Sequence, residues 1–296
     1  LFKEALSPSD VAKLPRSLTV LDSTNYQPHF SNASACIPLL PPRLTSLFIV
    51  LDSNIPAPAA KYPTMHLTSL SLFKFAWTVE SVEVLPSCLE QFSVMSHLST
   101  ILPEAMNRLT RQLKVLKIDW VVTGDEERDS AVLAELPPSL VVLRIGYNNT
   151  CVTPLVLSPN SVSLFPRTLA FLGFPQSALL RPGALKFLPP NLTELELPGA
   201  AIKPDELADL TTLALKKLYW SVNAPLENHH IAFLPRSLQR LYVTNMIMDG
   251  SHEPGSLLTS DAVPLLPRGL SPPLVSIAGA SKLMNSWASQ RSEMRL

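Results

Sequence analysis

Two short stretches carry residue types that could do chemistry. His229 and His230 are adjacent and follow Glu227, and imidazole and carboxylate groups are side-chain types that can bind zinc. Because neighbouring side chains diverge in a loop, we predict a solvated loop here, with metal binding as the alternative. Residues 125–129, Asp-Glu-Glu-Arg-Asp, form the densest charge run. We predict another solvated loop for them, and a docking loop for a basic partner is the alternative.

Motifs of known catalytic sites are missing from the sequence. It contains no G-x-S-x-G, no P-loop, no G-x-G-x-x-G and no H-E-x-x-H. Only 9 of the 296 residues are glycine, which leaves little material for phosphate-binding loops. We therefore predict that the chain is not an enzyme and that it uses no cofactor and no metal.

The chain is organised around a repeated stretch, of which L-P-R-S-L-Q-R-L-Y-V at 234–243 is the clearest copy. Similar stretches begin at Leu136 and Leu188, and all share the skeleton L-P-x-x-L-x-x-L-x-hydrophobic. Aligned on the first leucine of L-x-x-L, the copies run from Leu18 to Leu270. Their spacing is 22 to 32 residues, with a mean of about 25.

The end of each copy alternates buried and exposed positions, as a strand with one buried face does. A single copy cannot bury that face alone, so neighbouring copies must stack. We predict an α/β repeat solenoid over residues 1–274, with about ten to eleven repeats. Its strands form a parallel concave sheet, and its convex segments are short helices, 3-10 turns or irregular. Residues 275–296 form a C-terminal cap or tail, and Leu274 to Ile277 form a last edge strand.

Prolines recur at one position of the repeat. Of the 29 prolines, those three residues before the aligned leucine are at 15, 41, 86, 137, 166, 189, 235 and 267. We place them in the turn that enters the strand, where a fixed φ helps and a missing N–H costs little. The repeats of Leu113 and Leu215 lack this proline.

This L-P-x-S-L-x-x-L form resembles a leucine-rich repeat, and most of all the proline-containing repeats of protist and amoebal proteins, including FNIP-type repeats. It also resembles the shorter repeats of bacterial effector ubiquitin ligases. The resemblance covers residues 14–274 and implies a leucine-rich-repeat horseshoe. The Phe-Asn-x-Pro signature of FNIP repeats is absent, and the asparagine that ties coils together in many leucine-rich repeats occurs only at Asn148 and Asn223. Other side chains or water must therefore satisfy these backbone groups, and we expect irregular coils.

Residues between the buried strand positions must face the concave surface, and they predict two partner-binding patches. Tyrosine, tryptophan and arginine are the residue types favoured at interface hot spots. Alternatively, these rings pack locally against each other or against a terminal segment. The patches consist of Lys117, Trp120, Arg144 and Tyr147 in the middle of the solenoid, and of Lys217, Tyr219, Arg240 and Tyr242 near its C-terminal end.

Composition restricts the partners and the compartment. The 24 basic and 24 acidic residues cancel, so nothing in the net charge favours nucleic acid. No uninterrupted apolar run reaches about 18 residues, so we predict no membrane span. Three separated cysteines form no disulfide framework, which favours a cytoplasmic or other intracellular setting, although three N-glycosylation sequons would permit secretion. The chain starts without methionine, and we interpret it as a fragment or a processed product.

These observations favour a non-catalytic scaffold that binds a protein partner through its concave face. A repeat array offers a wide preformed surface at little ordering cost. One alternative is the substrate-receptor part of a ubiquitin ligase whose recruiting domain lies outside this chain. Another is a structural subunit of a large assembly, which a high apolar fraction on the convex side would favour.

Overall fold

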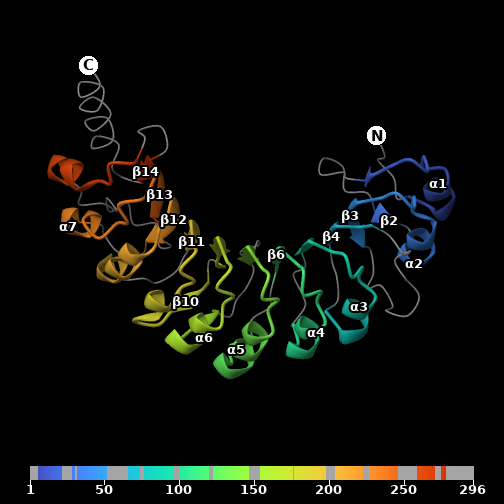
Figure 1. Ribbon diagram of the computed structural model, residues 1–296, viewed down its shortest axis with the longest axis horizontal. Coiled ribbons are helices and arrows are strands. Elements are labelled where there is room, and N and C mark those ends of the chain that lie inside the picture. Colours follow the sequence, from blue (N-terminus) through green and yellow to red (C-terminus); the bar gives the residue numbers. More distant parts are fainter. Residues whose placement is uncertain are drawn as a thin grey trace, which may run out of the picture. The chain divides into compact units, whose positions relative to one another are not determined.

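The computed structural model describes residues 6–21, 29–30, 32–51, 66–73, 77–95, 101–119, 123–146, 154–175, 177–197, 204–222, 227–245, 259–270 and 275–277. The chain forms two compact units, Leu1–Cys151 (unit 1) and Val152–Leu296 (unit 2). Within each unit, parallel strands form one wall, and short α- and 3-10 helices form the wall behind them (Figure 1).

Unit 1 carries its strands in one parallel sheet, in the order β1-β3-β4-β5-β6-β7. The register repeats from strand to strand, since Val20 pairs with Ser46, Ser46 with Ser69, and Ser69 with Gln91. The short strand β2 pairs with the far end of β3. The elements are α1 (Pro8–Ala12), β1 (Val20–Leu21), β2 (His29–Phe30), α2 (Ala33–Cys36), η1 (Ile37–Leu39), β3 (Ser46–Leu51), β4 (Ser69–Phe73), α3 (Val79–Glu83), β5 (Gln91–Met95), α4 (Pro103–Asn107), β6 (Val115–Ile118), α5 (Glu126–Ala134) and β7 (Val142–Ile145).

Unit 2 repeats this plan, with parallel strands in the order β9-β11-β12-β13-β14. A second small sheet pairs β8 with β10. The elements are β8 (Val156–Leu157), α6 (Pro159–Ser163), β9 (Phe171–Gly173), β10 (Leu179–Leu180), η2 (Ala184–Phe187), β11 (Glu194–Leu197), η3 (Pro204–Thr212), β12 (Lys217–Val222), α7 (Asn228–Ile231), β13 (Arg240–Asn245), η4 (Ser260–Leu265) and β14 (Val275–Ile277).

The apolar positions of the repeat form the core of both units. The second leucine position of the repeat is the second residue of strands β3 to β7, β9 and β11 to β13, and it belongs to the core. Its exposure is at most 1% at Leu47, Leu70, Phe92, Leu116, Leu143, Leu172, Leu195, Leu218 and Leu241. These side chains pair in register across neighbouring strands, as Leu172, Leu195 and Leu218 do. The parallel repeat solenoid predicted from the sequence is therefore confirmed.

The recurring prolines close the turn before each strand. The N–H of Leu18 donates to the carbonyl of Pro15 at 3.0 Å, and the bond recurs at all eight aligned prolines with lengths of 3.0 to 3.2 Å. Proline donates no hydrogen bond, but its carbonyl still accepts, so this position suits it. In the repeat of Leu113, Thr110 accepts the same bond at 3.2 Å. The predicted turn is confirmed, and proline favours it without being required.

Hydroxyl groups tie successive coils together in the turn that enters each strand. The carbonyl of Thr19 accepts both the N–H of Ser46 at 3.1 Å and the hydroxyl of Thr45 at 3.0 Å. In later coils, the Ser139 hydroxyl donates to the Leu113 carbonyl at 2.9 Å, and the Ser237 hydroxyl donates to that of Leu215 at 2.8 Å. The asparagine position itself lies after each strand, where nearly every copy is outside the described residues, so the replacement of the ladder by other side chains or water remains a prediction.

The charge run at 125–129 was predicted as a solvated loop, and the structure corrects this. Asp125 caps helix α5 by accepting the N–H of Glu127 at 3.0 Å. Asp129 is only 2% exposed, because it shares the inward face of α5 with Val132 and Leu133. The hydroxyl of Thr123 donates to Asp129 Oδ1 at 3.0 Å. Burial raises the pKa of the Asp129 carboxyl, partly offset by the bonds from Thr123.

The histidine pair and the last strand also have defined places. His229 and His230 lie on α7, and His230 is 7% exposed, so the predicted solvated loop is wrong for this residue. The two rings are in contact, with centroids 3.8 Å apart, and of the two only His230 is buried. Strand β14 pairs in parallel with β13, which confirms the predicted last strand over 275–277, and Leu274 lies outside the described residues. Residues 278–296 lie outside the described part of the chain, so the cap or tail remains a prediction.

Candidate binding surface on the sheet face

The exposed side of each sheet carries the residues that alternate with the buried leucines. In strand β11, Glu194 and Glu196 are partly exposed, whereas Leu195 and Leu197 are fully buried. Parallel pairing without slippage then aligns equivalent residues of neighbouring coils in rows. We call this exposed side the sheet face.

Two tyrosines stack on the sheet face of unit 2. Tyr219 of β12 and Tyr242 of β13 are in register, and their ring centroids are 4.6 Å apart with an interplanar angle of 4°. Both side chains are half-buried. Each ring covers one face of the other. The sequence predicted that these residues are neighbours, and it gave local packing of the rings as the alternative to partner contact; the stack agrees with that local packing.

Charged residues flank the tyrosine pair in the next row. Glu194, Lys217 and Arg240 lie side by side in register across β11, β12 and β13. Lys217 Nζ is 2.6 Å from Glu194 Oε1, and the two side chains are 28% and 31% exposed. This ion pair neutralises the lysine. For Arg240, no side-chain partner is found among the described residues. We call Glu194, Lys217, Tyr219, Arg240 and Tyr242 the tyrosine patch.

The second predicted patch lies on unit 1 and is only partly described. Lys117 and Arg144 pair in register on β6 and β7, so the structure brings these two cations side by side. Lys117 is exposed and Arg144 is half-buried. Trp120 and Tyr147 lie outside the described residues, so their part in this patch remains a prediction.

Glu194 belongs to the tyrosine patch but was not among the partner-binding residues predicted from the sequence. It lies 23 residues before Lys217, which is one repeat, and its place on the sheet face could be read from the alternation. That the two side chains meet depends on their rotamers, which the repeat pattern does not specify.

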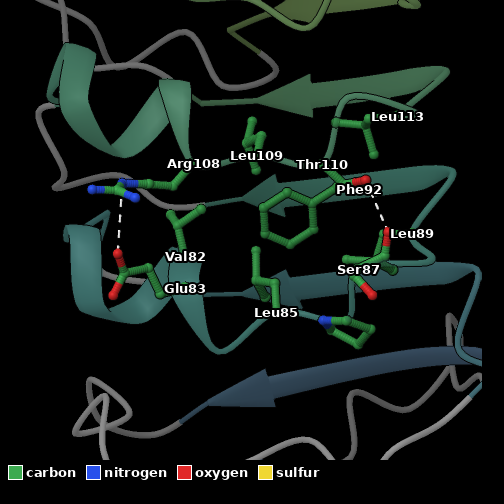
Figure 2. A pocket seen from close by; sticks show the side chains of 11 residues that line it. Val82, Glu83, Leu85, Ser87, Leu89, Phe92, Arg108, Leu109, Thr110 and Leu113 are labelled. Carbon is green, nitrogen blue, oxygen red and sulfur yellow. Dashed lines mark hydrogen bonds and ion pairs between the residues drawn. The ribbon is translucent and has the colours of Figure 1, made fainter.

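Unit 1 also contains a pocket of about 300 Å³ between the coils of β5 and β6. Figure 2 shows apolar side chains along its length, among them Val82, Leu109 and Phe92. Its polar groups bind each other: Arg108 Nε lies 3.5 Å from Glu83 Oε1, and Thr110 donates to the Ser87 carbonyl at 2.9 Å. Ligand pockets begin at about 300 Å³ and present convergent polar groups to the ligand. Here those groups are already paired, so the pocket offers little specificity.

The described cysteines lack the setting of a nucleophile. Cys36 is buried, and burial raises the pKa of its thiol, which keeps it protonated. Cys88 donates to the Leu67 carbonyl at 3.4 Å, which ties two coils together. No helix among the described residues is long and apolar enough to cross a bilayer.

The buried leucine rows, the parallel register and the helix behind each strand define the fold of a leucine-rich repeat in each unit. No family model matches the chain, and no curated protein matches it. The fold is therefore assigned from the described strands and side chains of the chain itself.

Solved structures give low-identity likenesses. The leucine-rich repeat-containing protein LegL7 from Legionella pneumophila is 12% identical over 96% of this chain and 94% of its own, with a TM-score of 0.47. CroV588, described as a circular leucine-rich-repeat structure, is 18% identical over 87% and 43%, with a TM-score of 0.36. A chain of the mouse RP105/MD-1 complex is 15% identical over 92% and 51%, with a TM-score of 0.45. At such scores, nothing about function follows.

Proposed function

We propose that this chain is a non-catalytic recognition scaffold that binds a protein through the tyrosine patch of unit 2. The observation that supports this best is the stacked pair of Tyr219 and Tyr242 on an exposed sheet face. Tyrosine contributes a large, rigid contact area with few torsions to immobilise, which is why it is common in binding surfaces. A pair already held by stacking loses still less entropy on binding.

The chemistry of the patch describes its partner. The tyrosine rings suit a flat apolar group, such as an aromatic ring or a proline, and each phenol can add a hydrogen bond. Arg240 has no described side-chain partner and suits a carboxylate, which its guanidinium can bind with two hydrogen bonds. Lys217 is already paired with Glu194 and contributes less. The partner therefore presents an acidic residue close to an aromatic or proline residue.

The test begins by identifying the partner and ends with its affinity. Proteins captured by the wild-type chain are identified by mass spectrometry, and each is purified and titrated against a variant with Tyr219→Ala and Tyr242→Ala. Loss of two hot-spot rings costs about 2 kcal/mol or more, which is roughly a thirtyfold increase in Kd. The matched control changes Ser71 and Ser93, on the sheet face of unit 1, to alanine. Equal affinity of the tyrosine variant and the wild type for every captured protein would refute the proposal.

The unit 1 patch is tested in the same titration. A variant with Lys117, Trp120, Arg144 and Tyr147 changed to alanine loses affinity only if the partner also contacts unit 1. If this variant alone fails to bind, the binding surface lies on unit 1 and not on the tyrosine patch.

One observation favours a second candidate function, that of a structural subunit covered on its helical wall. Leu164, which follows α6, is 39% exposed, and Phe187 in η2 is 51% exposed. They occupy equivalent positions in adjacent coils, two residues before the recurring proline. Two large apolar side chains at equivalent positions suit a packed interface. Light scattering tests this: an assembly that a Leu164→Asp, Phe187→Asp variant abolishes would support the structural role, and a monomer at all concentrations would exclude self-assembly.

A further inference from the structure

Three ligand-type side chains converge on the helical wall of unit 2. Asp205 lies in the first turn of η3, and His229 and His230 lie on α7, one coil later. The possible ligand atoms of all three lie within 4.8 Å of one another. Asp205 Oδ1 is 3.7 Å from His229 Nε2 and 3.6 Å from His230 Nε2. Around tetrahedral zinc, with bonds of about 2.0–2.2 Å, ligand atoms are roughly 3.4 Å apart. The two distances to Asp205 exceed this value by only a few tenths of an ångström, and the distance between the two histidine ligand atoms is at most 4.8 Å.

Glu227 prepares His229 for coordination. Its Oε2 lies 3.4 Å from His229 Nδ1, which favours the tautomer with the proton on Nδ1. The lone pair of Nε2 then points toward Asp205, and two electron-rich atoms face each other across the gap. A cation between them relieves this repulsion. Metal-bound histidines commonly donate their other N–H to such a carboxylate.

His230 is the third ligand, and its recruitment has a cost. It is 7% exposed, so its ring lies in the protein interior beside Asp205. However, its Nδ1 accepts the N–H of Glu227 at 3.0 Å, which places the proton of the neutral ring on Nε2. Coordination through Nε2 requires that proton to move to Nδ1, and the Glu227 N–H then loses its acceptor.

We propose that Asp205, His229 and His230 bind one divalent transition-metal ion, best suited to Zn²⁺, which clips two neighbouring coils of unit 2 together. Two imidazoles with one carboxylate favour zinc and its neighbours over Mg²⁺ or Ca²⁺, which prefer oxygen ligands alone. The carboxylates of Asp205 and Glu227 add negative charge that favours a dication. A bound metal stabilises the folded state, because the unfolded chain does not hold the three ligands together.

The experiment uses the full chain, without a histidine tag and freed of metal by chelation. It is titrated with CoCl₂, followed by visible absorption, and with ZnCl₂, followed by equilibrium dialysis. The proposal requires one ion per chain and a rise in Tm with Zn²⁺. Asp205→Ala and His229→Ala should each weaken metal binding by at least about tenfold. Even residues that only hydrogen-bond to a metal ligand cost this much affinity when they are removed. Both side chains are more than half exposed, so these variants keep the fold.

Matched controls remove an exposed residue of the same type elsewhere: His66→Ala in unit 1 and Asp261→Ala in η4. Both bind like the wild type if the site is the one proposed. No binding to the wild-type chain, or equal binding by the Asp205 and His229 variants, overturns the proposal. Amide exchange tests His230 separately: Zn²⁺ accelerates exchange at Glu227 if the cap bond is given up. Unchanged Glu227 exchange in the zinc-bound chain shows that His230 is not a ligand and overturns the three-ligand site.

Discussion

Replacing Leu195 by alanine tests the assignment of the repeat leucines to the core. Leu195 is completely buried between Leu172 and Leu218, its register partners on β9 and β12. The change removes three carbon atoms, and at about 0.8 kcal/mol for each buried methylene the transfer part is about 2.4 kcal/mol. The cavity adds to this, and measured Leu→Ala losses at buried sites are about 2.7–5.0 kcal/mol. We expect the free energy of unfolding of unit 2 to fall by about 3–4 kcal/mol.

The matched control is Leu164→Ala, which changes the same residue type in the same unit. Leu164 is 39% exposed, so its loss costs about 1 kcal/mol or less. Both variants are unfolded in urea and followed by far-UV circular dichroism and by tryptophan fluorescence, for which the buried Trp220 is a reporter in unit 2. If the two losses agree within about 0.5 kcal/mol, burial at the leucine position does not determine stability, and the core assignment fails.

Three further predictions concern single contacts. A double-mutant cycle of Tyr219→Ala and Tyr242→Ala in urea should give a coupling of about 0.5–1.5 kcal/mol for the stacked rings, and zero coupling would contradict the stack. Gly269→Ala should lower the free energy of unfolding by about 1–3 kcal/mol, measured by heat or urea, because the new Cβ would lie 2.8 Å from the Leu238 carbonyl oxygen. Its control is Ser237→Ala at the equivalent position of the previous coil, which loses only one hydrogen bond. Burial raises the native pKa of Asp129 above its ordinary value of 3.8. The protonated form therefore contributes its full stability below pH 3.8, and this contribution is lost as the pH rises through the raised pKa. Asp129→Asn keeps an oxygen acceptor for Thr123, so it should be more stable than the wild type at pH 7 and lose this advantage in acid. A difference in unfolding free energy that does not change with pH would contradict the raised pKa.

Much of the fold was predictable because the same pattern of buried and exposed positions occurs in every copy of the repeat. One L-x-x-L-x-L stretch is ambiguous, but aligned copies give the strand, its buried face and the register together. The prolines were predictable for the same reason, since each lies where only a carbonyl is needed, as in the bond from Leu18 to Pro15. The sheet face followed from the alternation, and with it the pairing of Tyr219 with Tyr242.

Other features depend on contacts that the repeat pattern does not contain. The burial of Asp129 and His230 arises because a short helix directs one face inward, and both residues lie in stretches that read as polar loops. Asp205 lies close to His229 and His230 of the next coil, although these residues belong to no common sequence motif.

The sequence by itself determined which strand residues are buried and the order of the strands in the sheet, because hydrophobic periodicity and stacking leave a single consistent register. Only the tertiary structure decided which exposed residues act together. It paired Lys217 with Glu194, stacked the two tyrosines and gathered Asp205, His229 and His230. The physical reason is that such contacts depend on rotamers and on distances of a few ångströms between coils, which periodicity does not encode.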